Sequence, residues 1–222
     1  MKKKMVVVLD FEGPVANSMP TLIKLGMKCV RKYFNAEMAK VEMTEEKAEE
    51  MVLRFSGGTF REAFLNVLAF LVPGYDQEKC EQCYKELFEK RATIYEEVEP
   101  FPEVVGVIKQ LSISKNFHLV ISSGLERAYI EGFLKRIGVI NLFEVIYGGD
   151  DGKKEKHIQM FRHKYPGEEM VIVADSLYEI GLGVKSIGVA QKTWQAQLLK
   201  KAGASAIISS LDQLEDRLDQ LL

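Results

Sequence analysis

Short apolar runs spaced along the chain limit its fold more than any other feature of the sequence. Six of them are rich in valine and isoleucine and do not alternate with polar residues. This pattern is typical of strands that are buried on both faces of a parallel sheet. The runs are residues 5–9, 117–121, 143–147, 170–174, 187–190 and 206–208.

From the second run onward, the segments between the runs mostly carry helical periodicity. Strands that alternate with helices in this way predict an α/β domain with a doubly wound parallel sheet, similar to a Rossmann fold. The last segment is expected to be an amphipathic helix packed on the sheet. The expected helices are residues 104–111, 125–137, 156–163, 193–202 and 211–222.

The interval between the first two runs breaks this rhythm, because most of it looks helical. Pro100 and Pro102 stop a helix where the chain returns to the core. We therefore predict a core domain from residues 1–18 and 98–222, and an inserted helical domain from residues 19–97. The helices expected in the insert are residues 21–34, 44–54, 59–71 and 77–96.

The composition is that of an ordinary soluble globular protein. Apolar residues make up 47% of the 222 residues, charged residues make up 28%, and the net charge is -2. Without a basic surplus, the chain is not expected to bind nucleic acid. The basic residues 2–4 precede only five apolar residues, too few for a signal peptide or a membrane span. We expect a cytoplasmic protein with no membrane partner, and the sequence leaves its oligomeric state open.

Neither the cysteines nor the histidines form a convincing metal or redox site. Cys80 and Cys83 lie in a helical pattern with no second pair to complete a zinc set, and Cys29 makes the cysteine count odd. We interpret Cys80 and Cys83 as small residues on one helix face. The three histidines lack ligand spacing and are expected to be structural or surface residues; they are His118, His157 and His163.

Polar side chains follow four of the apolar runs. In an open parallel sheet, ligands bind outside the carboxyl ends of the strands, so these residues should converge on one edge. Carboxylates are the oxygen ligands that Mg²⁺ prefers, and hydroxyl and ammonium groups bind phosphate oxygens. The residues are Asp10 and Glu12 after the first run, Ser122, Ser123 and Gly124 after the second, Asp150, Asp151, Lys153 and Lys154 after the third, and Asp175 and Glu179 after the fourth.

These four segments resemble the four motifs of the haloacid dehalogenase superfamily. Residues 6–18 resemble the first motif, hhhhDxDGTLxDS, and residues 171–179 resemble the fourth, hhhhGDxxxD. Ser122 resembles the strand-end hydroxyl of the second motif, and Lys154 resembles the lysine of the third. The helical insert matches members that carry a helical cap after the first motif, such as phosphoglycolate phosphatases and proteins similar to beta-phosphoglucomutase.

The resemblance implies a phosphatase that depends on Mg²⁺ and acts on a small phosphorylated metabolite. It makes Asp10 the nucleophile that forms an aspartyl phosphate, and Glu12 the acid and base. Ser122 and Lys154 would bind the transferring phosphoryl oxygens. The metal would be held by Asp10, by the backbone carbonyl of Glu12, and by Asp175 with Glu179.

Further residues are candidates for contacting the substrate. Ser123 and Gly124 follow the second-motif serine, and Arg127 comes shortly after them. In the insert, Arg54 and Arg61 flank a Gly57-Gly58 turn that is expected to face the site. Thr59 belongs to the same polar cluster, although a Thr followed by a helix is also an ordinary N-cap.

The sequence leaves several alternatives open. It departs from the family motifs at Glu12 and Glu179, where aspartate is usual, and at Pro14 and Ala174, where threonine and glycine are usual. A phosphosugar mutase would carry the same motifs, and a protein that only binds phosphate or a partner could keep the fold. An acid at position 12 argues against a dehalogenase or a phosphonate hydrolase. Which of Lys153, Lys154 and Lys156 binds phosphate is open too.

Overall fold

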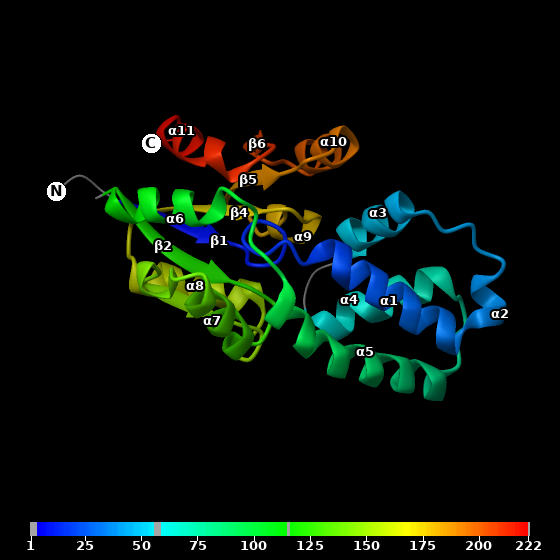
Figure 1. Cartoon of the computed structure of the whole chain (residues 1–222). Helices are drawn as coiled ribbons and strands as arrows, with labels where there is room; N and C mark the ends of the chain where they lie inside the picture. Colours follow the sequence, from blue (N-terminus) through cyan, green and yellow to red (C-terminus); the bar gives the residue numbers. More distant parts are fainter. Residues whose placement is uncertain (1–3, 56–58, 115, 222) are drawn as a thin grey trace.

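A computed structural model, which describes residues 4–55, 59–114 and 116–221, contains one parallel sheet at the centre of the core. Its six strands lie in the order β3-β2-β1-β4-β5-β6 and all neighbouring pairs are parallel (Figure 1). The α/β fold class is therefore confirmed. The strands are β1 (Met5–Leu9), β2 (Phe117–Ser122), β3 (Val145–Tyr147), β4 (Glu169–Ala174), β5 (Lys185–Val189) and β6 (Ala206–Ile208).

Helices cover both faces of the sheet, which is why its strands are apolar throughout. Alternate side chains of β1 point to opposite faces: Val7 packs with helices α6, α7 and α11, whereas Val8 packs with α8. Helix α10 covers the β5 side through Leu199. The core helices are α6 (Val104–Ile113), α7 (Arg127–Arg136), α8 (Lys154–Lys164), α9 (Leu177–Ile180), α10 (Thr193–Lys201) and α11 (Leu214–Asp219).

Five helices between β1 and β2 form a unit beside the sheet, beyond the carboxyl end of β1 (Figure 1). This helical unit has a hydrophobic cluster of its own, which includes Leu68, Cys29, Cys80 and Cys83. All three cysteines are free and buried, as the interpretation of small core residues requires. The helices are α1 (Met19–Tyr33), α2 (Asn35–Met38), α3 (Glu45–Phe55), α4 (Phe60–Leu71) and α5 (Gln77–Glu97).

The two chain segments that join the helical unit to the core run side by side. Ala16 forms an antiparallel bridge with Pro100, and the Asn17 amide donates to the Glu99 carbonyl at 3.1 Å. The unit is thus inserted at one place in the core, next to the residues that follow β1.

The third strand and the C-terminal helix differ from the expected elements for reasons that the structure shows. The third strand begins at Val145 rather than residue 143, because residues Ile140–Leu142 form a 3-10 turn and Phe143 packs into the core before the strand begins. The expected C-terminal helix is divided into a 3-10 turn, Leu211–Gln213, and the short helix α11. Its apolar face still packs on the sheet, through Leu214 and Leu218.

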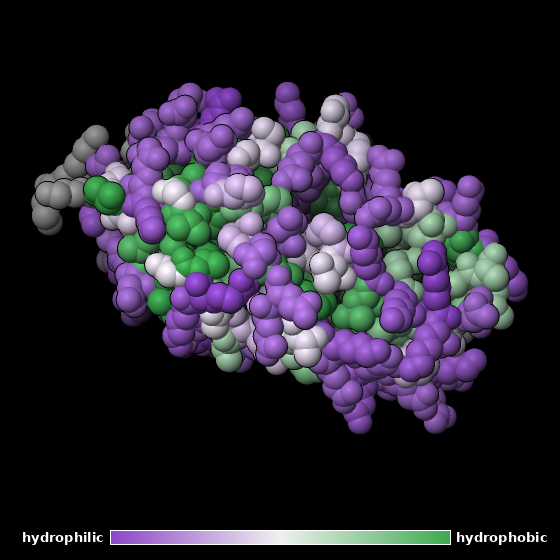
Figure 2. All heavy atoms as spheres, viewed as in Figure 1, coloured by the Kyte–Doolittle hydropathy of each residue, from purple (hydrophilic) through white to green (hydrophobic). Residues whose placement is uncertain are grey.

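Hydrophilic side chains cover most of the visible face in Figure 2, and apolar side chains show between them, notably over the helical unit. Within the ranges that the structure describes, we found no helix with the length and apolar character needed to cross a membrane.

Candidate active site

The sheet brings Asp10 and Asp175 to the same crevice. In the sheet, β2 lies on one side of β1 and β4 lies on the other. From β1 the strands proceed to one edge of the sheet through β2 and β3, and from β4 they proceed to the opposite edge, so the strand order reverses between β1 and β4. Ligands bind at such switch points. Asp10 directly follows β1 and Asp175 directly follows β4, and the Asp10 amide donates to the Val173 carbonyl at 2.9 Å.

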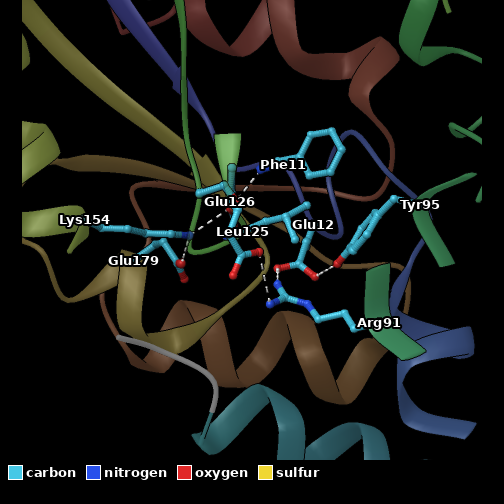
Figure 3. Close-up of polar contacts among 10 residues, drawn as sticks. Phe11, Glu12, Arg91, Tyr95, Leu125, Glu126, Lys154 and Glu179 are labelled. Atoms are coloured by element: carbon cyan, nitrogen blue, oxygen red, sulfur yellow. Dashed lines mark hydrogen bonds and ion pairs between the residues drawn. The ribbon is translucent and has the colours of Figure 1, made fainter. Parts of the chain in front are cut away.

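Lys154 joins two of the carboxylates. It is the first residue of α8, and its buried Nζ lies 2.8 Å from Asp10 Oδ1 and also donates to Glu179 Oε1 (Figure 3). The neighbouring lysines lie elsewhere: Lys153 pairs with Glu62 in the helical unit, and Lys156 donates to the Asp151 carbonyl. Of the three lysines, Lys154 is thus the one that contacts Asp10.

The cluster holds more acidic than basic side chains. Asp10, Asp175 and Glu179 are opposed by the single charge of Lys154. Burial raises the pKa of Asp10 to about 7, although Lys154 acts to lower it, and burial with the neighbouring carboxylates raises the pKa of Asp175 well above its usual value. One further cation would relieve this imbalance.

Gly13 allows Asp175 to approach the loop after β1. Its φ is +94°, in the region that favours glycine, and a Cβ atom there would lie 2.0 Å from Asp175 Oδ2. No other residue fits both the backbone conformation and this close approach. The glycine of the first motif therefore has a physical role in this chain.

Ser122 is oriented by a residue that the sequence did not single out. The Ser122 hydroxyl lies at the end of β2, is buried, and lies 2.9 Å from His157 Nδ1. His157 Nε2 is buried and has no hydrogen-bond partner among the described residues. An imidazole that donates from Nδ1 leaves Nε2 without a proton and leaves the Ser122 proton free to donate to a ligand.

Glu12 is held by the helical unit. Its carboxylate accepts hydrogen bonds from Arg91 Nη2, at 3.2 Å, and from the Tyr95 hydroxyl, and both residues come from α5 (Figure 3). Arg91 is only 2% exposed, and its guanidinium carbon lies 3.9 Å from the centre of the Phe60 ring. Glu126 approaches the same guanidinium at 3.8 Å. Asp10 of the first motif contacts Lys154, whereas Glu12 of the same motif is held by Arg91 and Tyr95, which are distant in sequence.

A cavity of about 190 Å³ opens beside this cluster and continues into the helical unit. At the core end it is lined by Asp10, Glu12, Lys154, Asp175 and Glu179, together with Gly124. At the other end its walls are side chains of α1, α3, α4 and α5. The four strand-end segments therefore face one space.

The expectation that Arg54 and Arg61 face this space is wrong. Arg54 is exposed and pairs with Glu50 one turn earlier in α3, and Arg61 is exposed and pairs with Glu81 of α5. Neither lines the cavity. Thr59 does line it, and it also caps α4 in a reciprocal arrangement with Glu62, which is the alternative that the sequence left open. Gly57 and Gly58 lie outside the described residues.

Of the expected substrate-binding residues after β2, one lines the cavity and two do not. Gly124 lines the cavity, whereas the Ser123 hydroxyl is buried and accepts a hydrogen bond from the Leu125 amide. Arg127 was expected to contact the substrate, but its guanidinium binds both carboxylate oxygens of Asp151, which turns it away from the cavity. Ser123 and Arg127 thus stabilise the loop instead.

The donor set fits a magnesium ion in part. Among the described residues, no three His, Cys, Asp or Glu side chains are arranged as a ready metal cage. The Glu179 carboxylate binds Lys154, and the Glu12 carboxylate binds Arg91, which leaves the backbone carbonyl of Glu12 as its expected contribution to the metal. The side chains of Asp10, which is buried, and Asp175, which is half-buried, are two oxygen donors crowded beside a loop of backbone carbonyls, which suits a hard divalent cation.

Comparison with solved structures shows the same fold in bacterial proteins. A hydrolase of the haloacid dehalogenase-like family from Streptococcus pneumoniae is 13% identical, with a TM-score of 0.74, over 98% of this chain and 100% of that chain. A predicted phosphatase from Clostridium acetobutylicum is 19% identical (TM-score 0.72; 99% and 100% covered). A proposed beta-phosphoglucomutase from Thermotoga maritima is 18% identical (TM-score 0.65; 98% and 100% covered).

A search of curated proteins gave no match. The family model for haloacid dehalogenase-like hydrolases matches residues 7–189, from the first strand to the fifth. This range contains all the residues of the carboxylate cluster, with Ser122 and Lys154. The chain belongs to the haloacid dehalogenase-like hydrolase family.

Proposed function

We propose that the protein is a Mg²⁺-dependent phosphatase that hydrolyses a small phosphate monoester through an aspartyl phosphate on Asp10. The observation that carries the proposal is the Lys154 ammonium, 2.8 Å from the Asp10 carboxylate at the switch point of the sheet. A buried carboxylate beside an ammonium and a strand-end hydroxyl has the groups needed to attack and bind a phosphoryl group. The family assignment supports the same reaction class.

The first step transfers the phosphoryl group to the protein. An Asp10 carboxylate oxygen forms a bond to phosphorus while the bond from phosphorus to the ester oxygen breaks. Glu12, in its protonated form, gives its proton to the leaving oxygen. Ser122 and Lys154 donate to the phosphoryl oxygens, where fixed donors lower the barrier most.

The second step returns the protein to its starting state. Glu12, now a carboxylate, takes a proton from a water molecule that attacks the aspartyl phosphate. Inorganic phosphate leaves, Asp10 is restored, and Glu12 is protonated again. Arg91 and Tyr95 serve this step by holding the Glu12 carboxylate in place.

A magnesium ion bound by Asp10, Asp175 and the backbone carbonyl of Glu12 would supply positive charge that offsets the charge of nucleophile and phosphate. We include Asp175 because its carboxylate is held against Gly13 without a cationic side chain of its own. In this proposal Glu179 does not bind the metal or the phosphate, but holds the Lys154 ammonium in position.

The helical unit is proposed as a cap domain, residues 19–97, that hinges near Ser18 and Glu99. Three observations support this role. The connections to the core lie side by side, the unit has its own hydrophobic cluster, and the cavity at Asp10 is lined by both parts. Closing such a unit over the substrate excludes water and brings α5, with Arg91, against Glu12.

A phosphosugar mutase is the second candidate, since a proposed mutase shares the fold and such an enzyme would use the same strand-end residues. The two differ in the fate of the phosphoryl group, which a mutase returns to a sugar hydroxyl and a phosphatase passes to water. Release of inorganic phosphate therefore separates them.

The test is an assay of phosphate release from a panel of phosphate monoesters, with Mg²⁺ and with a chelator. We expect turnover that needs Mg²⁺ and is lost in Asp10→Asn. Undiminished activity after chelation would contradict the metal requirement, and undiminished activity in Asp10→Asn would contradict the proposed nucleophile.

A further inference from the structure

We infer that the substrate is the phosphate ester of an apolar alcohol or phenol, rather than of a sugar. This inference rests on the proposed function, because it takes Asp10 as the place where the phosphoryl group is bound. It comes from the cavity that begins at Asp10 and Lys154 and continues into the helical unit. An ester bound with its phosphoryl group at Asp10 has this cavity as the space for its alcohol part.

The walls of the cavity in the helical unit are almost entirely apolar. They include Met27 and Val30 of α1, Met51 of α3, Phe64 and Val67 of α4, and Leu87 of α5. Most of these side chains also belong to the hydrophobic cluster of the helical unit. Part of the hydrophobic cluster of the helical unit therefore lines the cavity, which reaches the phosphoryl site.

Polar groups in this part of the wall are few and mostly engaged. Thr59 exchanges hydrogen bonds with Glu62 as the cap of α4. Arg91 binds Glu12, and two of its nitrogens, Nε and Nη1, have no hydrogen-bond partner among the described residues. These nitrogens lie next to Glu12, at the core end of the cavity, and the deeper walls, as far as the described residues form them, carry only apolar side chains besides Thr59.

This distribution of polar and apolar groups in the cavity wall favours some leaving-group alcohols over others. A sugar has several hydroxyl groups, and each hydroxyl that is buried without a partner destabilises the complex. An alkyl chain or an aromatic ring buries only apolar surface, which stabilises the complex in proportion to its area. The cavity therefore favours an apolar leaving group over a phosphosugar.

Gly26 of α1 offers a way to fill the cavity without disturbing its walls. It lines the cavity, and a Cβ atom added there would have no other heavy atom within 4 Å. Gly106 is a matched control, because it is also a helical glycine with open space around its Cβ position, but it lies exposed on α6 of the core.

The test compares ethyl, butyl and hexyl phosphate, whose leaving groups are nearly equal in basicity, with glucose 6-phosphate. We expect kcat/KM to rise about fourfold for each added methylene, the fold-change that corresponds to burying one CH₂ group. Glucose 6-phosphate should be poorer than hexyl phosphate by at least tenfold. In Gly26→Leu the ratio of hexyl to ethyl activity should fall at least tenfold, in Gly26→Ala it should fall less, and Gly106→Leu should keep the wild-type ratio.

The wild-type series decides the matter even if Gly26→Leu folds poorly, which its circular dichroism and thermal unfolding would reveal. Activity that depends on Asp10 but does not rise with chain length, or that favours the sugar phosphate, would overturn this inference and leave the proposed function standing. If no phosphate monoester is hydrolysed, the proposed function is wrong and the inference falls with it.

Discussion

At the scale of single residues, the site is defined by charges that burial leaves unbalanced. Lys154 contacts Asp10 and Glu179, and Asp175 lies close by and forms no ion pair with any described residue. Burying such clustered carboxylates destabilises the folded protein, because a carboxylate loses its hydration when it leaves water. The polar residues around the cluster, His157 above all, should therefore affect stability as well as activity.

Stability at mildly acidic pH should depend on His157. Burial lowers the pKa of its imidazole to about 4, against about 6.5 in an unfolded chain. Between these values the unfolded chain takes up a proton that the folded protein does not. The free energy of unfolding should therefore decrease as pH falls from 6.5 to 4, by up to about 3 kcal/mol.

This contribution should be absent in His157→Gln, whose side chain does not titrate but can still hydrogen-bond Ser122. Urea unfolding of both proteins at pH 4.5 and pH 7.5 measures the difference. If both proteins lose the same stability between these two pH values, His157 is not held in its neutral form.

At the scale of secondary structure elements, α5 connects the helical unit to the chemistry. Its buried positions 80, 83, 87, 91 and 94 follow the spacing of one helix face, and the residue at position 91 is an arginine. A charge within an apolar helix face is a signal in the sequence that points to a buried functional contact. Its partner Glu12 is 79 positions away, and no local pattern indicates such a distant contact.

Arg91→Met should impair proton transfer rather than phosphoryl binding. The methionine keeps apolar contact with Phe60 but removes the hydrogen bond that orients Glu12. We expect kcat for an alkyl phosphate to fall about tenfold, the loss that corresponds to one hydrogen bond with a charged group. The rate of the first step should fall less for an aryl phosphate, because its leaving group needs little protonation.

The measurement is single-turnover release of the alcohol from both esters. Lys90→Met is the control, because Lys90 is the preceding residue of α5, is exposed, and pairs only with Glu86. An equal loss of rate on both esters in Arg91→Met would contradict a role in orienting the acid.

At the scale of the whole molecule, the sequence predicted the parallel sheet, the position of the inserted helices, and the convergence of Asp10, Lys154 and Asp175 on one cavity. These features follow from strand burial and from the geometry of parallel sheets, which local patterns reveal. Arg54 and Arg61 were not placed correctly. Arg54 pairs with Glu50 at the i,i+4 spacing of its own helix, which the sequence itself indicates, whereas Arg61 pairs with Glu81 of a neighbouring helix, and that pairing depends on packing.

The same arrangement makes the stability of the whole molecule depend on the metal. Asp175→Asn removes one of the carboxyl groups that are crowded together at the site, so we expect the free energy of unfolding without Mg²⁺ to rise by about 1–2 kcal/mol. Wild-type protein should gain about 2.7 kcal/mol at a Mg²⁺ concentration one hundred times the dissociation constant, and Asp175→Asn should gain much less.

Thermal unfolding with and without Mg²⁺ measures both effects. Asp219→Asn, at an exposed position in α11, is the control for loss of a carboxylate and should respond to Mg²⁺ as wild type does. Should Asp175→Asn keep the full response to Mg²⁺, its carboxylate does not bind the metal.

In the proposed mechanism, Asp10 carries the phosphoryl group and Glu12 moves the proton. To test both roles, each variant is mixed with an aryl phosphate and Mg²⁺ and quenched in acid, and the mass of the protein is measured. Glu12→Gln should accumulate an adduct of one phosphoryl group that is stable in acid and lost in base, because its first step needs little protonation and its second step lacks the base. Asp10→Asn should show no adduct. An adduct on Asp10→Asn would contradict the account, as would full activity of Glu12→Gln on alkyl phosphates.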